Sequence, residues 1–392
     1  MSSTAPGPGL LVIPQLPRLR RDPLGAMLDY HREYGDIVRL GDGSFSVHLL
    51  GHPELAEHVL RRNHRNYDRQ TRSADAVRVV TGESLMTNDG DAWKHHRLLM
   101  QPLFNEDALD HLRAITIDAT NAMVDRWRGT LDIVPELVRL TSTITARALF
   151  GADVDSELVE LMPLVFEETY ARATAVLPFR IASRKFHRAL DHVRATVDRI
   201  IELGDSPLLT KLRELDPEEM RSEVIALLLS GHETTANVLA WTFALMKPGD
   251  PPRESVQEAM RLYPPVWIVE RRAIEDDEIA GYTIPADSIV YVSPYVLHRH
   301  RDFWTDAERF DPTRFPEAEH NDAYLPFGAG PHRCIGAAFA MIQAPLVIET
   351  VLTRCTLTLA DDARIEPHPL ITLRPRFGVR MECGSRAAAL GA

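Results

Sequence analysis

The longest apolar stretch of the chain, VIALLLSGHETTANVLAWTFALM over Val224–Met246, limits the folds open to it. A run of this length could cross a membrane, yet polar and ionisable residues, among them Ser230, Glu233 and Asn237, interrupt its centre. An ionised side chain is costly at the middle of a bilayer, whereas a helix that is apolar all round suits the core of a large protein. We therefore expect a long helix buried in a soluble protein.

The rest of the chain is mainly helical, with short strands near both ends. Helical periodicity runs from about residue 53 to 246 and returns over Gly336–Leu352, while residues 36–51 read as two strands. Repeats, low-complexity tracts and long linkers are absent, which favours one domain over residues 1–392, with a loosely ordered, proline-rich segment at 1–20. We expect an α+β fold, mostly α with small β-sheets, whose helical core encloses a cofactor.

Composition excludes several classes of protein. The 392 residues carry a formal net charge of -12, which argues against a nucleic-acid-binding protein. Cys334, Cys355 and Cys383 lie far apart with no C-x-x-C pattern, so neither a disulfide framework nor a zinc finger is indicated. Prolines interrupt the short apolar run at the N-terminus, which predicts neither a signal peptide nor a membrane anchor. We expect a cytoplasmic protein.

A glycine-rich loop, LPFGAGPHRCIG, carries Cys334. Its glycines let the backbone turn tightly and approach a flat group, and amides at the start of the following helix can stabilise a thiolate. The thiol could be a metal ligand, a nucleophile with His332 as a nearby base, or a small buried side chain. The loop favours a ligand, and the other two cysteines are expected to be structural.

The centre of the apolar run reads SGHETTAN. A zinc-protease motif H-E-x-x-H would need a second histidine at Ala236, so that interpretation fails. Glu233 and Thr234 place an acid beside a hydroxyl, a pair that can deliver protons. The alternative is a helix-bending threonine beside a satisfied buried acid.

Two further segments carry charged residues at helical spacing. Glu258 and Arg261 lie one helical turn apart in ESVQEAMRLYPP, a spacing that is weak evidence by itself. Trp93 and Arg97 lie at positions i and i+4 in DAWKHHRLLM, on one face of a helix. An arginine on such a face requires an anionic partner if it is buried.

These four segments, in this order, resemble the cytochrome P450 family. Its haem-binding signature F-x-x-G-x-x-x-C-x-G is matched at all four fixed positions, Phe327, Gly330, Cys334 and Gly336. The resemblance extends over nearly the whole chain, from DPLGAMLDYHREYG to LRPRFGVRM. It implies the cytochrome P450 fold around a buried haem b, with Cys334 as the axial ligand of the iron.

The resemblance also implies roles for residues outside the loop. Gly231 would leave room for dioxygen above the haem, and Glu233 and Thr234 would relay protons to it. Donors to the anionic haem propionates would be Trp93, Arg97, Arg271 and His332. Arg272 competes with Arg271 for that role. A buried charged network would join Glu258, Arg261 and, from the DPTRF segment, Arg314.

The implied activity is that of a haem-thiolate monooxygenase, which inserts one oxygen atom of O2 into a small organic substrate in secondary metabolism. Two alternatives stay open: oxidative coupling or cyclisation of an aromatic or peptide natural product, and a non-catalytic protein that recruits partners. The chain has no reductase domain, so electrons would come from a ferredoxin or flavodoxin with an NAD(P)H reductase. Such an acidic partner could dock on the basic residues Lys94, His95, Arg97 and Arg333, for which ordinary surface charge is the alternative. Neither a nucleic acid nor a membrane is expected as a partner.

The chain departs from the family between two of the motifs. Thr234 and Glu258 are only 24 positions apart (258 − 234), where the family normally has an additional helix. Residues 247–253, KPGDPPR, run straight from one helix to the next. The sequence therefore predicts an internal deletion, and leaves open whether stability falls or a partner or second subunit compensates.

Overall fold

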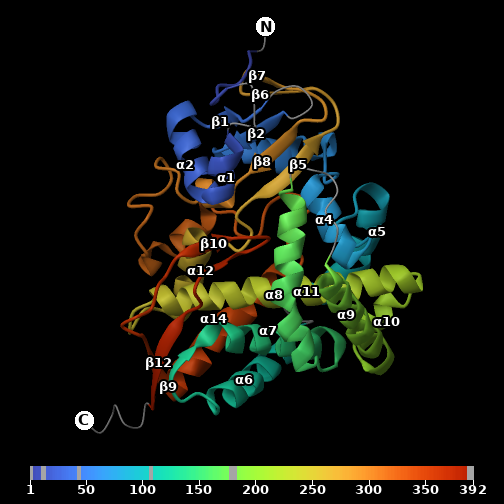
Figure 1. Ribbon diagram of the computed structural model, residues 1–392, viewed down its shortest axis with the longest axis vertical. Helices are drawn as coiled ribbons and strands as arrows, with labels where there is room; N and C mark the ends of the chain where they lie inside the picture. The colour runs from blue at the N-terminus through green and yellow to red at the C-terminus, as the bar shows by residue number, and fades with distance from the viewer. Residues whose placement is uncertain (1–2, 10–14, 42–45, 106–108, 176–182, 386–392) are drawn as a thin grey trace. The chain divides into compact units, whose positions relative to one another are not determined.

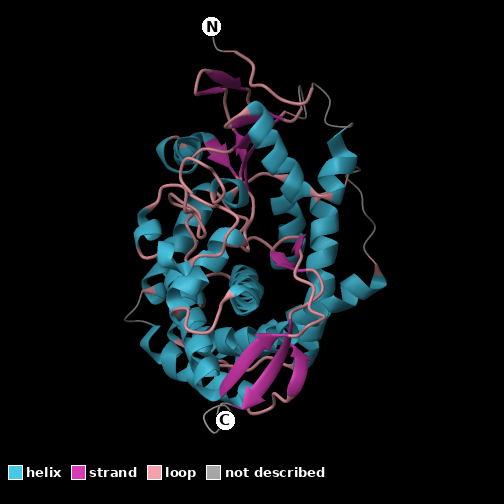
Figure 2. Ribbon diagram, turned by 90° about the vertical axis from the view of Figure 1, so that its left-hand side faces the viewer, coloured by secondary structure: helices cyan, strands magenta, loops and turns pink. Residues whose placement is uncertain are grey.

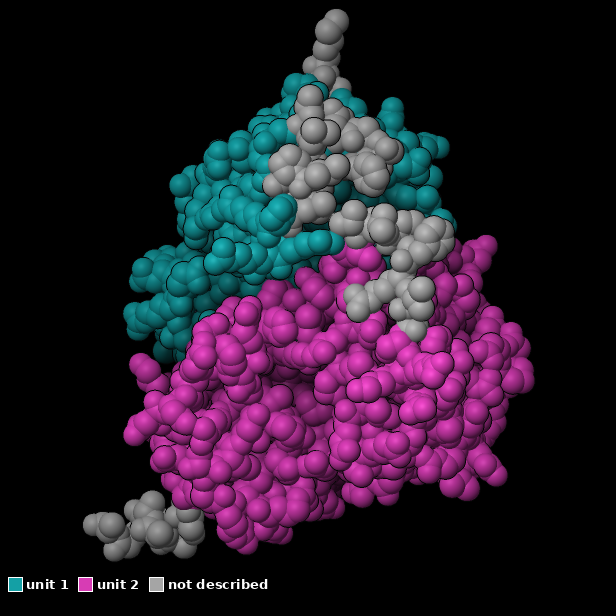
Figure 3. All heavy atoms as spheres, viewed as in Figure 1, with its two compact units in different colours: residues 1–72, 260–334 teal, residues 73–259, 335–392 magenta. Residues whose placement is uncertain are grey.

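The computed structural model describes residues 3–9, 15–41, 46–105, 109–175 and 183–385. These residues belong to two compact units, shown in different colours in Figure 3. The first comprises residues 1–72 and 260–334, and the second comprises residues 73–259 and 335–392. The cysteine loop therefore lies in the first unit, and the long apolar helix lies in the second.

A five-stranded sheet of order β1-β2-β8-β5-β3 organises the first unit. Its strands are β1 (Ile37–Arg39), β2 (Val47–Leu50), β8 (Ile289–Val292), β5 (Val269–Ala273) and β3 (Tyr67–Asp68). β2 and β8 run parallel, and the other neighbours are antiparallel. Aliphatic and β-branched residues such as Leu50, Val290 and Val292 fill its buried core, as expected of strand sequences. A separate hairpin joins β6 (Asp277–Ile279) to β7 (Tyr282–Ile284).

Short helices complete the first unit. They are α1 (Leu16–Arg21), α2 (Pro23–Tyr34), α3 (Pro53–Glu57), α13 (Pro294–Leu297), and the single turns η3 (His58–Arg62), η4 (His64–Asn66), η7 (Pro312–Arg314) and η8 (Glu317–His320). In α2, the side chain of Asp22 accepts a hydrogen bond from the amide of Gly25, and Pro23 occupies the first turn. The helix ends before Gly35, whose φ of 92° suits only glycine.

Parts of the N-terminal segment are paired or buried. Ser3 forms a parallel bridge with Tyr282, its amide donating to the carbonyl of Gly281 at 3.0 Å. Ala5 is buried in the core of the first unit, and Leu16–Arg21 forms α1. Pairing and burial thus hold parts of the described segment, and the expectation of a loosely ordered stretch over residues 1–20 stays a prediction. Residues 1–2 and 10–14 lie outside the described part.

The second unit is dominated by helices, as Figures 1 and 2 show. They are α4 (Arg72–Thr81), α5 (Gly90–Met100), η5 (Gln101–Phe104), α6 (Asp110–Val124), α7 (Ile133–Phe150), α8 (Ser156–Ala173), α9 (Arg184–Leu203), α10 (Pro207–Leu212), α11 (Pro217–Leu245) and α14 (Ala337–Arg354). α11 packs on α7, and α14 packs on α6. The predicted fold, mostly α with small sheets, is confirmed.

The second unit also contains a small three-stranded sheet and a β-hairpin. One is a three-stranded sheet of β4 (Gly129–Asp132), β12 (Arg380–Ser385) and β9 (Cys355–Leu359), with β12 in the middle (Figure 2). The other is the hairpin of β10 (Pro367–Pro369) and β11 (Leu373–Pro375). The indole of Trp241 on α11 donates to the carbonyl of Leu373 at 3.1 Å, which fixes this hairpin to the long helix.

The long apolar run forms α11, as expected. Asp216 caps its start in a capping box with Glu219, and Pro217 occupies the first turn. The described helix that is long and apolar enough to cross a membrane is α14 rather than α11, and 44% of that window is buried. Length and composition alone do not distinguish such a helix from a core helix of a soluble protein.

The connection after α11 is as short as the sequence predicts. α11 ends at Leu245, and α12 (Pro252–Leu262) begins after a tight turn. In that turn the amide of Lys247 donates to the carboxylate of Asp250 at 2.7 Å, and Gly249 has a φ of 94°. Residues 246–251, all of which the structure describes, form no helix, so the predicted direct connection is confirmed.

Candidate active site

The cysteine loop is a tightly hydrogen-bonded turn at the end of the first unit. The amide of Cys334 donates to the carbonyl of Phe327 at 2.9 Å, and the amide of Arg333 donates to that of Gly330 at 3.1 Å. Gly330 has a φ of 71°, and a Cβ on it would lie 1.8 Å from the carbonyl oxygen of Leu60. Glycine is therefore required there, because both the backbone angle and the approach to η3 exclude a side chain.

The three cysteines differ in how they present their sulfur. Cys334 is exposed on its loop, whereas Cys355 is 4% exposed and Cys383 is intermediate. No disulfide joins these three residues, all of which lie in the described part. His332 and Phe327, which belong to the same loop, are half-buried. Gly336 is the N-cap residue of α14. An exposed thiol on a hydrogen-bonded, glycine-rich loop fits a thiolate ligand of a bound group.

One narrow stripe of α11 is less buried than the rest of the helix. Between Ser222 and Ala244 every residue is buried except Ser230, Gly231 and Thr234. Positions i, i+1 and i+4 share one face of a helix. The small and hydroxylated residues of the SGHETT motif thus form a single face that does not belong to the protein core, which fits a face directed at a bound group.

Glu233 and Thr234 have different surroundings although they are neighbours. The hydroxyl of Thr234 donates to the carbonyl of Ser230 at 2.7 Å. The carboxyl of Glu233 is 6% exposed, and its hydrogen-bond partner is Thr372, next to β11. Burial raises the pKa of Glu233 to about 7, against the opposing effects of Arg374 and of the bond to Thr372. A carboxyl that is half protonated at neutral pH can both accept and give a proton.

Gly231 has a structural reason to be small. A Cβ on it would lie 2.8 Å from Cγ2 of Thr145 on α7. Close packing of α7 on α11 thus requires glycine at this position, independently of the room for dioxygen that the sequence predicts. His232, the residue that follows, is 2% exposed, and its Nδ1 lies 2.9 Å from the carbonyl oxygen of Leu228. Burial lowers the pKa of His232 to about 4, so this histidine is neutral.

The predicted propionate donors on α5 lie on one half-buried face. Trp93 and Arg97 are both half-buried, while His96 and Met100 form the buried face of the helix. The Nε of Arg97 donates to the side chain of Gln101 at 3.0 Å. The spacing predicted from the sequence is therefore present, with both side chains on the same side of α5.

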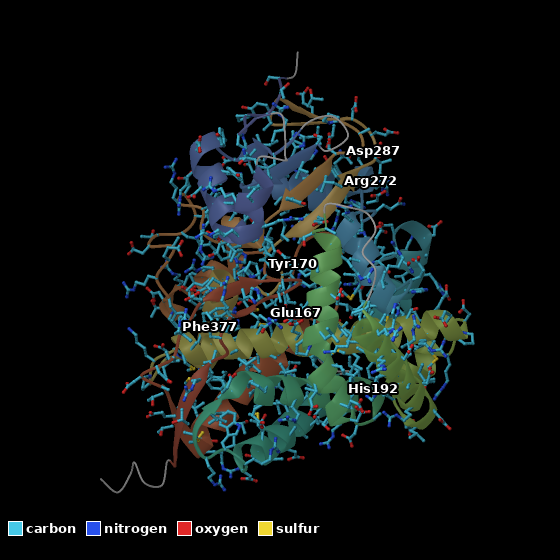
Figure 4. The ribbon with its side chains drawn as sticks, viewed as in Figure 1. Glu167, Tyr170, His192, Arg272, Asp287 and Phe377 are labelled. Carbon is cyan, nitrogen blue, oxygen red and sulfur yellow. The ribbon has the colours of Figure 1, made fainter. Side chains whose placement is uncertain are left out.

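The structure separates the roles of the two adjacent arginines on β5. Arg272 binds Asp68 through two nitrogens, at 3.1 and 2.6 Å, and lies beside Asp287 in Figure 4. Arg271 points to the other face of the strand, is 8% exposed, and donates to the carbonyl of Glu270 at 2.7 Å. With Arg272 engaged by a carboxylate, Arg271 is the better candidate for an anionic ligand.

Arg261 is the anchor of a buried polar cluster. It is fully buried, and its guanidinium donates to the carbonyls of His298 and Ala307, both at 2.8 Å, and of Arg309 at 3.1 Å. The same group lies 5.0 Å from the ring centroid of Trp304. Glu258 is fully buried on the same helix, and Arg314 donates to the carbonyl of Asp306 at 3.1 Å. The joint network of the three charged residues stays a prediction.

Several residues of the site were missed at the level of sequence. His298 binds the start of the cysteine loop, Glu223 pairs with His96, and Thr372 binds both Glu233 and Asn237. None of them belongs to a local motif. Glu223 directly precedes the apolar run Val224–Met246, and no local signal pointed to it or to Thr372.

Comparison with known protein families and solved structures identifies the family of this chain. The sequence model of the family described as cytochrome P450 matches residues 2–247 and 253–378. The chain belongs to the cytochrome P450 family. The interruption of the match falls in the short connection after α11. The solved structure of CYP175A1 from Thermus thermophilus superposes with a TM-score of 0.87 and 26% identity, covering 98% of this chain and 100% of that one. The predicted cytochrome P450 fold is thus confirmed.

Three of the relatives of this P450 come from Streptomyces. Cyclooctatin synthase of Streptomyces melanosporofaciens is 31% identical, over 87% of each chain. Cyclooctat-9-en-7-ol 5-monooxygenase of the same organism is 30% identical, over 87% of this chain and 84% of the relative. Pentalenene oxygenase of Streptomyces avermitilis is 28% identical, over 98% of both chains. The protein is a cytochrome P450 monooxygenase that uses a haem iron, a small-molecule substrate, O2 and a redox partner.

Proposed function

We propose that this P450 oxygenates a small, apolar, cyclic hydrocarbon or alcohol in secondary metabolism. The names of the relatives support this substrate class, since pentalenene and cyclooctat-9-en-7-ol are an alkene and an alkenol by name. We further propose that the cofactor is haem b, that a ferredoxin or flavodoxin with an NAD(P)H reductase supplies electrons, and that the protein is cytoplasmic.

The half-buried stripe of α11 is the observation that carries the proposal. A helix otherwise buried from Ser222 to Ala244 leaves only Ser230, Gly231 and Thr234 outside the core. These are the positions that a proton-delivering face requires, because each is small or bears a hydroxyl. The exposed thiol of Cys334, in the first unit, is a separate observation that supports a thiolate ligand for the bound group.

Each residue has one task in this scheme. Cys334 would ligate the iron, and Phe327, Gly330 and Gly336 would shape its loop. Anionic propionates would be held by Trp93, Arg97, Arg271 and His332. When bound, the haem supplies the chemistry that splits dioxygen and transfers one oxygen atom to carbon.

The protein's own groups hold the substrate and the protons. Thr234 presents a hydroxyl on the half-buried stripe, and Glu233 stores a proton in the interior at neutral pH. Because Glu233 is bound to Thr372 rather than to Thr234, proton transfer between them would need an intervening water or a rotation of the carboxyl.

The ligand role of Cys334 is tested by its replacement with serine. Cys334→Ser should lose the thiolate-type Soret band of the reduced carbon monoxide complex, while Cys355→Ser, at a buried thiol, should retain it. An unchanged spectrum in Cys334→Ser would overturn the assignment. Release of the cofactor into alkaline pyridine identifies its type, and a spectrum other than that of haem b would exclude haem b.

The substrate class is tested by spectral titration of the purified holoenzyme. Cyclic alkenes and alkenols should displace water from the iron and shift the Soret band, and turnover should yield a product heavier by one oxygen atom. Binding only of polar aromatic or peptide compounds, with products that have lost two hydrogens, would favour oxidative coupling instead.

A further inference from the structure

His298 is a buried histidine of the first unit. It follows α13 directly, and its side chain is fully buried. The ring packs against two aromatic side chains that also contact each other, with centroids 5.3 Å from Tyr324 and 6.4 Å from Trp304. Neither local sequence nor any motif singled this residue out.

Both ring nitrogens of His298 are engaged by backbone groups. Nε2 lies 2.9 Å from the amide nitrogen of Leu325, and Nδ1 lies 3.0 Å from the carbonyl oxygen of Arg261. A backbone amide can only donate, so Nε2 carries no proton. The proton is therefore on Nδ1, which donates to the carbonyl. The two partners together fix one neutral tautomer.

The electrostatic surroundings keep this ring neutral. Burial lowers the pKa of His298 to about 3, helped by the positive charges of Arg261 and Arg299, while the bond to the Arg261 carbonyl opposes the shift. The titratable side chain of Tyr324 also packs against the ring. Protonation would remove the acceptor that Leu325 needs, and at neutral pH this does not occur.

The Arg261 end of the bridge is rigid. The ring of His298 donates to the Arg261 carbonyl, and the guanidinium of Arg261 donates back to the His298 carbonyl at 2.8 Å. Two further carbonyls and the face of Trp304 hold the same guanidinium. A group with this many partners in the core moves little.

The Leu325 end is the entry to the cysteine loop. Leu325 accepts a bond from the amide of Gly328 at 3.1 Å, and two residues after it Phe327 accepts the amide of Cys334 at 2.9 Å. The bond from the Leu325 amide to His298 therefore joins the buried cluster to the first residue of the turn that holds the thiol. A shift at Leu325 would pass through these short turns to Cys334.

We propose that His298 is a positioning residue for the cysteine loop. Its neutral ring joins the main chain at Arg261 to the main chain at Leu325, and so sets the place from which Cys334 presents its sulfur. The spectroscopic part of this inference rests on the proposed role of Cys334 as the iron ligand, whereas the part that concerns the loop backbone does not.

Substitution by glutamine or by asparagine tests the two hydrogen bonds of the ring one at a time. The amide of glutamine reaches the place of Nε2, so His298→Gln can still accept from Leu325. The amide of asparagine reaches the place of Nδ1, so His298→Asn keeps the bond to Arg261 and loses the bond to Leu325. His298→Phe keeps the ring packing and loses both bonds. Val296→Ala, at a fully buried residue of α13, is the control for lost packing.

Hydrogen–deuterium exchange of the holoenzyme tests the bridge. In His298→Asn and His298→Phe, amides of the 325–334 segment should exchange about tenfold faster, as expected when one buried hydrogen bond is lost. His298→Gln should stay near the wild-type rate. Val296→Ala should lower the melting temperature without accelerating this segment selectively. Equal rates in the Gln and Asn variants, or the same acceleration in Val296→Ala, would overturn the proposal.

The spectrum of the reduced carbon monoxide complex gives an independent result. His298→Asn should convert from the thiolate-type band to the band of a lost thiolate faster than His298→Gln. Equal conversion in both variants would show that the bridge does not reach the sulfur. If the wild-type protein itself lacks the thiolate-type band, the role of Cys334 fails, and the exchange experiment still decides whether His298 holds the loop.

Discussion

His96 on α5 and Glu223 on α11 form a buried pair, with Nδ1 of His96 2.6 Å from Oε1 of Glu223. The two side chains are 1% and 0% exposed. The same oxygen accepts the amide of Leu85 at 2.6 Å, and Oε2 has no hydrogen-bond partner among the described residues. The bond to Glu223 raises the pKa of His96, and burial raises that of Glu223. The pair thus ties the helix of Arg97 to the helix of Thr234.

Breaking this pair should destabilise the protein strongly. His96→Ala leaves Glu223 buried without its partner, so we expect the free energy of unfolding to fall by about 3–5 kcal/mol. Glu223→Gln removes the charge and should lower the free energy of unfolding by a smaller amount. Because the residues are in contact, the double variant should lose less than the sum of the single losses.

Urea denaturation of the three variants measures this coupling. His95→Ala, at the exposed neighbouring histidine, is the control and should change stability by no more than about 0.5 kcal/mol. Additive losses in the double variant would mean that the two side chains do not stabilise each other.

What the sequence could predict is local in the chain. The cysteine loop and the SGHETT face each lie within a dozen residues, and the helix periodicity of α11 and α5 fixes which of their residues share a face. The short connection after α11 could likewise be predicted, because it depends only on the spacing between two motifs.

Partners that are distant in the chain could not be predicted. Asn237 and Thr372 are 135 residues apart and bond at 3.1 Å. His298 and Leu325 are 27 residues apart, with only the fold to bring them together. These bonds depend on how the β10–β11 hairpin meets α11 and how the segment after α13 returns to the loop. The union of both compact units in one domain stays a prediction.

The buried carboxyl of Glu233 should make stability depend on pH. Its pKa rises from an ordinary 4.5 to about 7, so the native state keeps this proton to higher pH than the unfolded state does. Native protein then binds more protons than unfolded protein in this range, and stability falls as pH rises from 4.5 to 7. The difference of about 2.5 pH units corresponds to about 3 kcal/mol.

Glu233→Gln should remove this dependence. The free energy of unfolding of the wild type relative to the variant should drop by about 3 kcal/mol between pH 4.5 and 8. Denaturant unfolding at several pH values measures it. Glu218→Gln, at an exposed residue of the same helix, should leave the wild-type profile unchanged. Parallel profiles for the wild type and Glu233→Gln would contradict the raised pKa.

The hydroxyl of Thr234 should affect how efficiently NAD(P)H consumption is coupled to product formation, and should not affect folding. Thr234→Val keeps the shape of the side chain and removes the hydroxyl on the half-buried stripe. Proton delivery by a positioned group contributes about 10²–10⁴-fold to rate, so product formed per NAD(P)H should fall and hydrogen peroxide should rise. Thr234→Ser should retain most of the product yield.

A matched control separates this effect from changes in the helix. Thr242 makes the same kind of bond, its hydroxyl donating to the carbonyl of Val238 at 2.7 Å, but it is fully buried two turns further along α11. Thr242→Val should leave the ratio of product to peroxide as in the wild type. The relay role of Thr234 is wrong if both valine variants behave alike.

Two glycines of the cysteine loop allow a test of its close packing. Gly328 and Gly330 have similar φ angles of 67° and 71°, yet a Cβ on Gly328 meets nothing within 4 Å, while one on Gly330 would lie 1.8 Å from the Leu60 carbonyl oxygen. Gly328→Ala should therefore cost only the strain of the left-handed backbone, about 1–2 kcal/mol. Gly330→Ala should cost that strain and, in addition, displace the loop from η3. We expect a larger loss of stability and a lower content of bound haem in Gly330→Ala, measured by denaturant unfolding and by the ratio of haem to protein. Equal losses in the two variants would mean that the loop does not depend on its contact with Leu60, since backbone strain alone would then account for both.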